Sequence, residues 1–137
     1  MIALDTNVLA RAIIEEADAD AATLEQQQAA RALLSSGEAL FLPVTVIEEL
    51  EWVLRGVYDL PETDVLSLLE DLLAIDNLAV DRAAAVAQAV EGLRRGMDFS
   101  DALHLAQAGH CGHLATFDAR FRKLAKHLRL QPPVLAV

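Results

Sequence analysis

The stretch Ile2–Asn7, which reads IALDTN, decides the fold, because a short apolar run ends here on an aspartate with two more polar residues behind it. A short apolar run is typical of a strand that is buried on both faces. Asp, Thr and Asn are also the residue types that begin helices, so helix capping alone could account for Asp5. The stretch therefore predicts a strand followed directly by a helix, and it leaves the purpose of Asp5 open.

The rest of the chain repeats this alternation of short apolar runs and helical segments. Further strands are predicted at residues 39–43, 78–80, 113–117 and 133–137. Helical segments are predicted at residues 8–16, 23–37, 45–58, 61–75, 82–95, 97–110 and 118–128. Strands that alternate with helices form a parallel sheet covered on both faces. We predict an α/β fold: a single domain of residues 1–137, built as a three-layer α/β/α sandwich around a central, mostly parallel five-stranded sheet.

Two helices carry more detailed predictions. In the segment 23–37, Thr23 is expected to be the N-cap and Gly37 the C-terminal stop. In the segment 45–58 the apolar stripe expected to face the core consists of Val46, Leu50, Val53 and Val57. Glu48 falls opposite this stripe, whereas Glu49 and Glu51 flank it on either side. Either flank could face a cleft, so periodicity does not choose between these two glutamates.

The length, charge and cysteine content of the chain limit the classes of function that the protein can have. The chain has 137 residues and a net charge of -10, which argues against a broad electrostatic nucleic-acid binder, and its apolar runs are too short to span a membrane. Cys111 is the only cysteine, and no signal peptide precedes the first strand, so we expect a cytoplasmic protein without membrane association. Five of the eleven basic residues fall in one late segment; they are Arg120, Arg122, Lys123, Lys126 and Arg129. That segment is either a solvated helix face or a local basic strip.

Acidic residues recur where strands end and helices start. Asp5 closes the first strand, Asp118 follows the fourth, and Asp101 and Glu49 lie in the first turns of helices. Sites in open parallel sheets form beyond the carboxyl ends of the strands. Each residue also has a purely structural interpretation: Asp98 could cap a helix with Asp101 as its capping-box partner, and Asp118 could cap the last helix. Together, carboxylates gathered without Lys or Arg favour a Mg²⁺ or Mn²⁺ site.

The segments IALDTN, EELEWVLRGVY, MDFSDALHLAQA and LATFDARF, in this order, resemble the signature of PIN-domain proteins, most closely the VapC-type ribonuclease toxins of type II toxin–antitoxin systems. The resemblance implies a catalytic and metal-binding quartet of Asp5, Glu49, Asp101 and Asp118. Its E-L-x-W-V-L pattern selects Glu49 over Glu48 and Glu51. The supporting residues that the resemblance implies are Asn7, Asp98 and Thr116.

The same resemblance implies an activity and partners. The activity is hydrolysis of RNA phosphodiester bonds with Mg²⁺ or Mn²⁺ as cofactor. We expect Arg120, Arg122 and Lys123 to contact the RNA. The implied partners are a cognate antitoxin protein and a second copy of the chain in a homodimer, with a higher hetero-oligomer also possible. The apolar surface near Trp52, Val53 and Val57 would accept an amphipathic helix of the antitoxin or the second protomer.

Three other functions share part of this pattern: a receiver-like signalling domain, a haloacid dehalogenase phosphatase and a PIN fold without catalysis. A receiver-like signalling domain would also bind Mg²⁺ at strand ends, with Asp81 as phosphoacceptor, but LDTN carries one acid instead of two and QPPVLAV lacks the expected lysine. A haloacid dehalogenase phosphatase would have a second Asp where Asn7 stands. A PIN fold that binds partners without catalysis remains open, although an intact quartet counts against it. The cluster His110, Cys111 and His113 lacks the distant fourth ligand of structural zinc.

Overall fold

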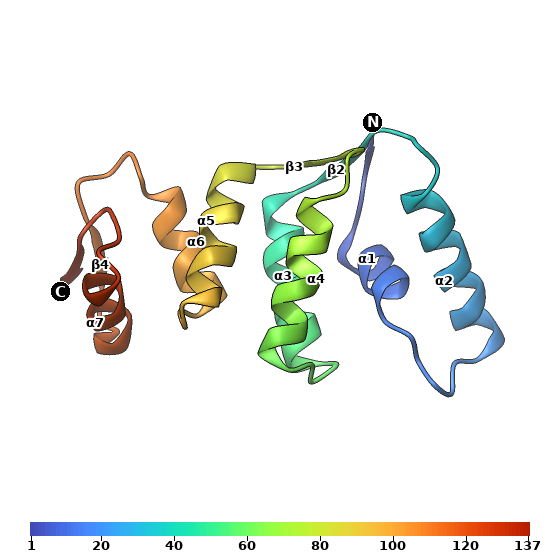
Figure 1. Cartoon of the computed structure of the whole chain (residues 1–137), viewed down its shortest axis with the longest axis horizontal. Helices are drawn as coiled ribbons and strands as arrows, with labels where there is room; N and C mark the ends of the chain where they lie inside the picture. Colours follow the sequence, from blue (N-terminus) through green and yellow to red (C-terminus); the bar gives the residue numbers. More distant parts are fainter. The chain divides into compact units, whose positions relative to one another are not determined.

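The computed structural model describes the whole chain, Met1–Val137, as two compact units, Met1–Ala83 and Ala84–Val137. Figure 1 shows the order of the elements along the chain, coloured from the N-terminus in blue to the C-terminus in red.

The first unit contains a three-stranded parallel sheet and four helices. Its elements are β1 (Ile2–Ala3), α1 (Thr6–Ile13), α2 (Ala21–Leu34), β2 (Leu40–Leu42), α3 (Val44–Gly56), α4 (Glu62–Leu73) and β3 (Leu78–Val80). The strand order is β1-β2-β3, so β2 is central. Leu40 of β2 lies opposite Ile2 on one side and Leu78 on the other. The parallel pairing predicted from the alternation of strands and helices is confirmed within this sheet.

The core of the first unit lies where α1 packs against α2 and α3, α3 packs against α4, and α4 approaches β3. Leu40 and Leu42 of the central strand are completely buried, as an apolar strand with no polar face requires. On α3 the buried residues are Ile47, Leu50, Glu51 and Leu54. This face differs from the predicted stripe, because Val57 is 61% exposed and Val46 and Val53 are only half-buried.

The error in the buried face of α3 has a physical cause. Apolar residues occur nearly all the way round this helix, and Trp52 is 57% exposed on its outer side. When apolar residues surround a helix, periodicity does not fix which side packs inward, and the tertiary contacts decide. Leu50 belongs to both the predicted and the observed face, so the prediction was wrong by a rotation about the helix axis.

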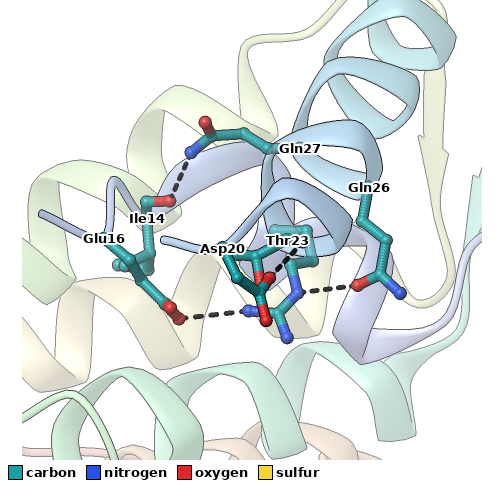
Figure 2. A network of polar contacts seen from close by, with 7 residues as sticks. Ile14, Glu16, Asp20, Thr23, Gln26 and Gln27 are labelled. Atoms are coloured by element: carbon teal, nitrogen blue, oxygen red, sulfur yellow. Dashed lines mark hydrogen bonds and ion pairs between the residues drawn. The ribbon is translucent and has the colours of Figure 1, made fainter. Parts of the chain in front are cut away.

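Helices α1 and α2 are joined by a polar network that also closes the C-terminus of α1. Figure 2 shows the part of this network around Ile14, Glu16, Gln26 and Gln27. The guanidinium of Arg11 donates to Gln26 Oε1 at 3.0 Å and to Glu16 Oε1 at 3.1 Å, and Gln27 donates to the carbonyl of Ile14 at 2.9 Å. The last carbonyls of a helix have no partner within the helix, so side chains from a neighbouring helix stabilise its end.

The N-terminus of α2 corrects a second prediction. Asp20, not Thr23, is the N-cap, and its Oδ1 accepts a hydrogen bond from the backbone N–H of Thr23 at 2.7 Å. Hydrogen bonds from Thr23 hold the pKa of Asp20 below its ordinary value, because they stabilise the ionised carboxylate. Asp is at least as good an N-cap as Thr, and an Asp three positions upstream therefore begins the helix earlier.

The second unit contains a two-stranded parallel sheet and three helices. Its elements are α5 (Ala83–Arg94), α6 (Phe99–Gln107), β4 (Leu114–Thr116), α7 (Ala119–His127) and β5 (Val134–Ala136). β4 pairs with β5, with Leu114 opposite Val134, and α7 packs on both strands. The structure thus confirms an α/β fold with parallel strands; the five strands form a three-stranded and a two-stranded sheet. No helix has the length and hydropathy that crossing a membrane would require.

Gly92 explains how α5 and α6 approach each other. A Cβ atom at position 92 would lie 2.8 Å from the Cβ of Ala102, closer than real Cβ atoms come to a neighbouring atom. The backbone N–H of Met97 also donates to the carbonyl of Gly92 at 2.9 Å, which turns the chain sharply between the two helices. The turn leads directly to Asp98, the residue with which α6 begins.

Candidate active site

Three carboxylates lie together in the second unit. Asp98, Asp101 and Asp118 line one cavity of about 400 Å³, together with Gly96, Met97, Arg120, Phe121 and Leu124. Asp98 and Asp101 come from the start of α6, and Asp118 from the start of α7. Two helix N-termini therefore bring three acidic residues to one hollow, although those residues are up to twenty positions apart in the sequence.

Two of these carboxylates are also helix caps, as their structural interpretation predicted. Asp98 Oδ1 accepts a hydrogen bond from the backbone N–H of Asp101 at 3.1 Å, and Asp118 Oδ1 accepts one from Phe121 at 3.0 Å. Each cap satisfies a backbone donor that has no partner within its helix. The capping bonds use one oxygen of each carboxylate, and they fix the direction of the side chain relative to its helix.

The surroundings of Asp101 disfavour its ionised form. Burial raises the pKa of Asp101 above its ordinary value, and the negative charges of Asp98 and Asp118 raise it further, whereas His104 acts in the opposite direction. A carboxylate whose charged form is disfavoured by burial and by like charges would be stabilised by a cation in the same cavity. Burial of Asp101 beside two like charges is thus an electrostatic setting that a cation would relieve.

Thr116 fixes the connection between β4 and α7. Its hydroxyl accepts a hydrogen bond from the backbone N–H of Asp118 at 3.1 Å, and its carbonyl accepts one from Arg122 at 3.1 Å. These bonds hold the end of the strand and the first turn of the helix in one arrangement. Thr116 therefore positions the backbone of Asp118.

In the first unit, Asp5 follows β1 and stands at the N-cap position of α1. It has extended backbone angles and makes no side-chain capping bond, in contrast to Asp98 and Asp118. Asp5 and Asn7 are exposed, whereas Thr6 between them is only 5% exposed and its hydroxyl has no hydrogen-bond partner. Helix capping through the side chain, the structural explanation for Asp5, is therefore not what the structure shows.

The glutamates of α3 differ strongly in their surroundings. Glu51 is only 2% exposed, and its carboxylate forms an ion pair with Arg55 at 3.0 Å. Glu49, two positions earlier, is exposed. Glu51 thus belongs to the buried face of the helix, although periodicity placed Glu49 and Glu51 alike beside the stripe. Of these two, Glu49 is the glutamate that solvent can reach.

The predicted quartet is divided between the two units. Asp101 and Asp118 share the cavity of the second unit, while Asp5 and Glu49 belong to the first. The structure contains no group of three or more His, Cys, Asp or Glu side chains placed to hold a metal ion. That all four carboxylates act together stays a prediction of the sequence.

A second hollow lies in the same unit as the carboxylate cavity and extends the predicted set of basic residues. It measures about 1000 Å³ between α7 and β5, and we call it the α7–β5 groove. Its cationic residues are Arg120, Arg122, Lys123, Lys126 and Arg129. All five belong to the basic segment of residues 120–129 that the sequence singles out as a possible RNA contact, of which Arg120, Arg122 and Lys123 are the residues named for it.

The residues present suit a divalent cation such as Mg²⁺. The acidic residues that line the cavity of the second unit offer carboxylate oxygens, and hard cations prefer oxygen ligands. Asp101 has a raised pKa, and carboxylates with a shifted pKa are frequent at functional sites. The buried hydroxyl of Thr6 has no hydrogen-bond partner, which is unusual in a protein interior. The donor chemistry therefore fits the ion.

Comparison with known proteins agrees with the α/β fold. A family model described as the PIN domain matches residues 2–127, nearly the whole chain. A search of curated proteins found no match. PIN domains are generally metal-dependent nucleases, which use a divalent ion such as Mg²⁺. The family match covers the first strand, both acidic helix starts and α7, and this chain belongs to the PIN domain family.

Proposed function

We propose that this protein is a metal-dependent ribonuclease and the toxin component of a toxin–antitoxin pair. The observation that carries the proposal is the gathering of Asp98, Asp101 and Asp118 around one cavity, with the ionised form of Asp101 disfavoured by its neighbours. Membership in a family of nucleases supports the hydrolase class. The choice of RNA as substrate, the toxin role and a cytoplasmic location rest on the sequence resemblance.

We propose Asp5, Glu49, Asp101 and Asp118 as the residues that hold the ion. Bound there, Mg²⁺ or Mn²⁺ would neutralise charge on the scissile phosphate and make water a better nucleophile. Asp118 is suited to this role because its capping bond to Phe121 fixes its direction. Asp98 acts as a positioning residue, since it holds the first turn of α6, in which Asp101 stands.

Exposure supports the choice of Glu49 on α3. The carboxylate of Glu51 is buried and already paired with Arg55, so using it as a ligand would break this ion pair. Glu49 is exposed and can reach an ion without breaking such a pair. The surroundings of the two glutamates thus favour the same residue that the motif selected.

We also propose that the two sheets belong to one central five-stranded sheet in a single domain. Within their own sheets β1 pairs only with β2, and β4 pairs only with β5. Asp5 and Asp118 each follow a strand by one residue: Leu4 stands between Ala3 of β1 and Asp5, and Phe117 stands between Thr116 of β4 and Asp118. Carboxyl ends of neighbouring parallel strands open at the same edge of a sheet, which would bring these two aspartates to one site.

The partners follow from the same proposal. An unrestrained ribonuclease would damage its own cell, so we propose a cognate antitoxin and a homodimer that assembles further with it. Trp52 and Val57, 57% and 61% exposed, are large apolar residues on the outer side of α3 and at its end. An exposed Trp with an apolar neighbour suits the apolar face of a partner helix. Co-expression with the adjacent open reading frame tests this: copurification and rescue of growth are expected, and harmless expression of the wild type alone would exclude a toxin.

The nuclease proposal is tested by cleavage of structured RNA. Wild-type protein with Mg²⁺ or Mn²⁺ is expected to cleave, and EDTA is expected to stop the reaction. Asp5→Asn should lower the rate by more than about 100-fold, since it removes a ligand and not merely a residue that orients one. Far-ultraviolet circular dichroism of the variant should match the wild type, because Asp5 makes no capping bond. Cleavage that persists in EDTA would rule out the metal mechanism, and equal cleavage by Asp5→Asn would point to a contaminating nuclease.

A further inference from the structure

Thr6 carries a buried hydroxyl for which the fold provides no partner. Thr6 and Glu51 are the buried polar residues of the protein, 5% and 2% exposed, and Glu51 is paired with Arg55. The hydroxyl oxygen of Thr6 is the only buried side-chain nitrogen or oxygen without a hydrogen-bond partner. Such a group destabilises a fold, because it gives up its hydrogen bonds to water and gains none in return.

Packing alone does not explain a hydroxyl at position 6. Thr6 lies on the buried face of α1 together with Leu9, Ala10 and Ala12, and Leu4 just before the helix is buried as well. Residues three and four positions apart share one face of a helix, so Thr6 continues the row of Leu9 and Ala10. A valine would have nearly the same shape and no polar atom to satisfy. The surroundings therefore favour an apolar residue, and the hydroxyl requires another explanation.

Asp5, the residue directly before Thr6, also differs from its equivalents. Helices α1, α2, α6 and α7 each have an aspartate at the N-cap position. In α2, α6 and α7 the carboxylate of this aspartate accepts a hydrogen bond from the backbone of its own helix, whereas Asp5 makes no such bond. Asp5 is exposed, so an ion can reach its carboxylate. Two consecutive polar side chains at the start of α1 are thus not used by the fold.

A cation held by Asp5 would give both side chains a role. Carboxylates and waters that bind an ion are themselves held by hydrogen bonds from neighbouring side chains, and these bonds fix their direction. A threonine hydroxyl can donate one hydrogen bond and accept others, so it can pair with either kind of ligand. Thr6 adjoins Asp5 in the chain and belongs to the same unit.

We infer that Thr6 is a positioning residue of the cation site: its hydroxyl forms a hydrogen bond to the ligand shell of the ion that Asp5 holds. This inference rests on the proposed function, which places Asp5 among the ligands. It adds a residue that neither the acidic quartet nor the supporting set of Asn7, Asp98 and Thr116 includes. The hydroxyl then costs stability without the ion and contributes affinity with it, so one substitution should change the two in opposite directions.

The test measures stability and metal binding without RNA. Full-length wild type, Thr6→Val and Thr6→Ser are denatured thermally in EDTA, and each protein, freed of EDTA, is titrated with Mn²⁺ by isothermal titration calorimetry. The Tm of Thr6→Val in EDTA should equal or exceed that of the wild type, because no hydrogen bond is lost. Its Kd for Mn²⁺ should rise about 10-fold to 100-fold, the usual effect of removing a group that orients metal ligands. Thr6→Ser keeps the hydroxyl and should bind Mn²⁺ nearly as tightly as the wild type.

Two further variants serve as controls. Thr63→Val makes the same substitution in the first turn of α4, in the same unit, at a residue that is exposed. Its Kd for Mn²⁺ should equal that of the wild type. Asp5→Asn identifies the binding event, because it removes the proposed ligand and should abolish this event.

The results separate a failure of the inference from a failure of the proposed function. A wild type that binds no Mn²⁺, or that binds it as tightly as Asp5→Asn does, would overturn the proposed cation site and the role of Thr6 with it. If only Asp5→Asn fails to bind, an unchanged Kd in Thr6→Val would overturn the inference alone. Equally weak binding by Thr6→Ser and Thr6→Val would do the same, since the hydroxyl would not be the cause. So would a Tm of Thr6→Val in EDTA well below that of the wild type, because the hydroxyl would then have a partner in the metal-free fold.

Discussion

Asp98 Oδ1 accepts a hydrogen bond from the backbone N–H of Asp101 at 3.1 Å, so the residue that begins α6 also holds the first turn in which the neighbouring carboxylate stands. Asp118 has the same relationship to Phe121 at the start of α7. Capping and function are therefore not competing explanations at these positions. The cap fixes a side chain in place, and the raised pKa of Asp101 shows that the fixed carboxylates are close enough to repel.

Two substitutions at Asp98 separate capping from charge. Asp98→Ala should lower the free energy of unfolding by about 1 kcal/mol, because the N-cap bond is lost. Asp98→Asn should leave it nearly unchanged, since Asn caps as well as Asp. Thermal and urea denaturation check both. If Asp98→Asn also loses RNA cleavage while its stability is intact, the charge of Asp98 matters for activity; equal stability of the Ala and Asn variants would contradict the capping role.

Asp101→Asn should stabilise the protein without metal. The pKa of Asp101 is raised in the folded state, so its proton contributes stability below the unfolded pKa of about 3.9, and this stability is lost as the pH rises through the folded pKa. At neutral pH the wild type therefore holds a disfavoured charge that Asn lacks. In EDTA the Tm of Asp101→Asn should exceed that of the wild type at pH 7, and the difference should shrink as the pH falls towards 4.

Metal should reverse this order. An ion that binds only the folded state raises the Tm of the wild type with concentration, and it should raise that of Asp101→Asn much less. Titration with Mg²⁺ and Mn²⁺ by differential scanning fluorimetry measures the effect without any RNA. A wild-type Tm that does not respond to either ion would remove the metal from the proposed site.

Glu49→Gln and Glu51→Gln should have opposite phenotypes. Glu51 is buried and paired with Arg55 at 3.0 Å, so Glu51→Gln should cost about 1 kcal/mol of stability and retain cleavage at a temperature where the variant is folded. Glu49 is exposed, and Glu49→Gln should keep the stability and lose cleavage. Denaturation curves and RNA cleavage on both proteins form one experiment. Loss of cleavage in Glu51→Gln alone would show that Glu51, and not Glu49, is the ligand.

Much of the fold was predictable because its signals are local. The helices of the structure agree with the predicted segments to within a few residues, and Asp98 and Asp118 cap the helices that the sequence assigned to them. The failures occurred where tertiary contacts decide. The N-cap of α2 is Asp20 and not Thr23. On α3 the buried residues include Ile47 and Leu54, whereas the predicted Val53 and Val57 are not buried.

The same distinction applies to the candidate site. Sequence position shows that Asp5 and Asp118 follow strands, because strand ends and helix starts are local features. It could not show that Glu51 is buried, since an acidic residue beside an apolar stripe is usually exposed, and its pairing with Arg55 is visible only in three dimensions. Nor could it show that the basic residues of α7 face a common groove with β5.

Arg122→Ala and Lys123→Ala should separate the structural from the RNA-binding part of the basic segment. Arg122 donates to the carbonyl of Thr116 at 3.1 Å and is partly buried, so Arg122→Ala should cost about 1 kcal/mol of stability and loosen the turn that precedes Asp118. Lys123 is exposed on the groove, and Lys123→Ala should change stability by less than about 0.5 kcal/mol. Both variants remove one positive charge, so any difference in Tm reports the bond to Thr116 and not the net charge. Salt-dependent RNA binding should weaken in Lys123→Ala at full stability; if instead Arg122→Ala is as stable as Lys123→Ala, the bond to Thr116 contributes nothing to the fold.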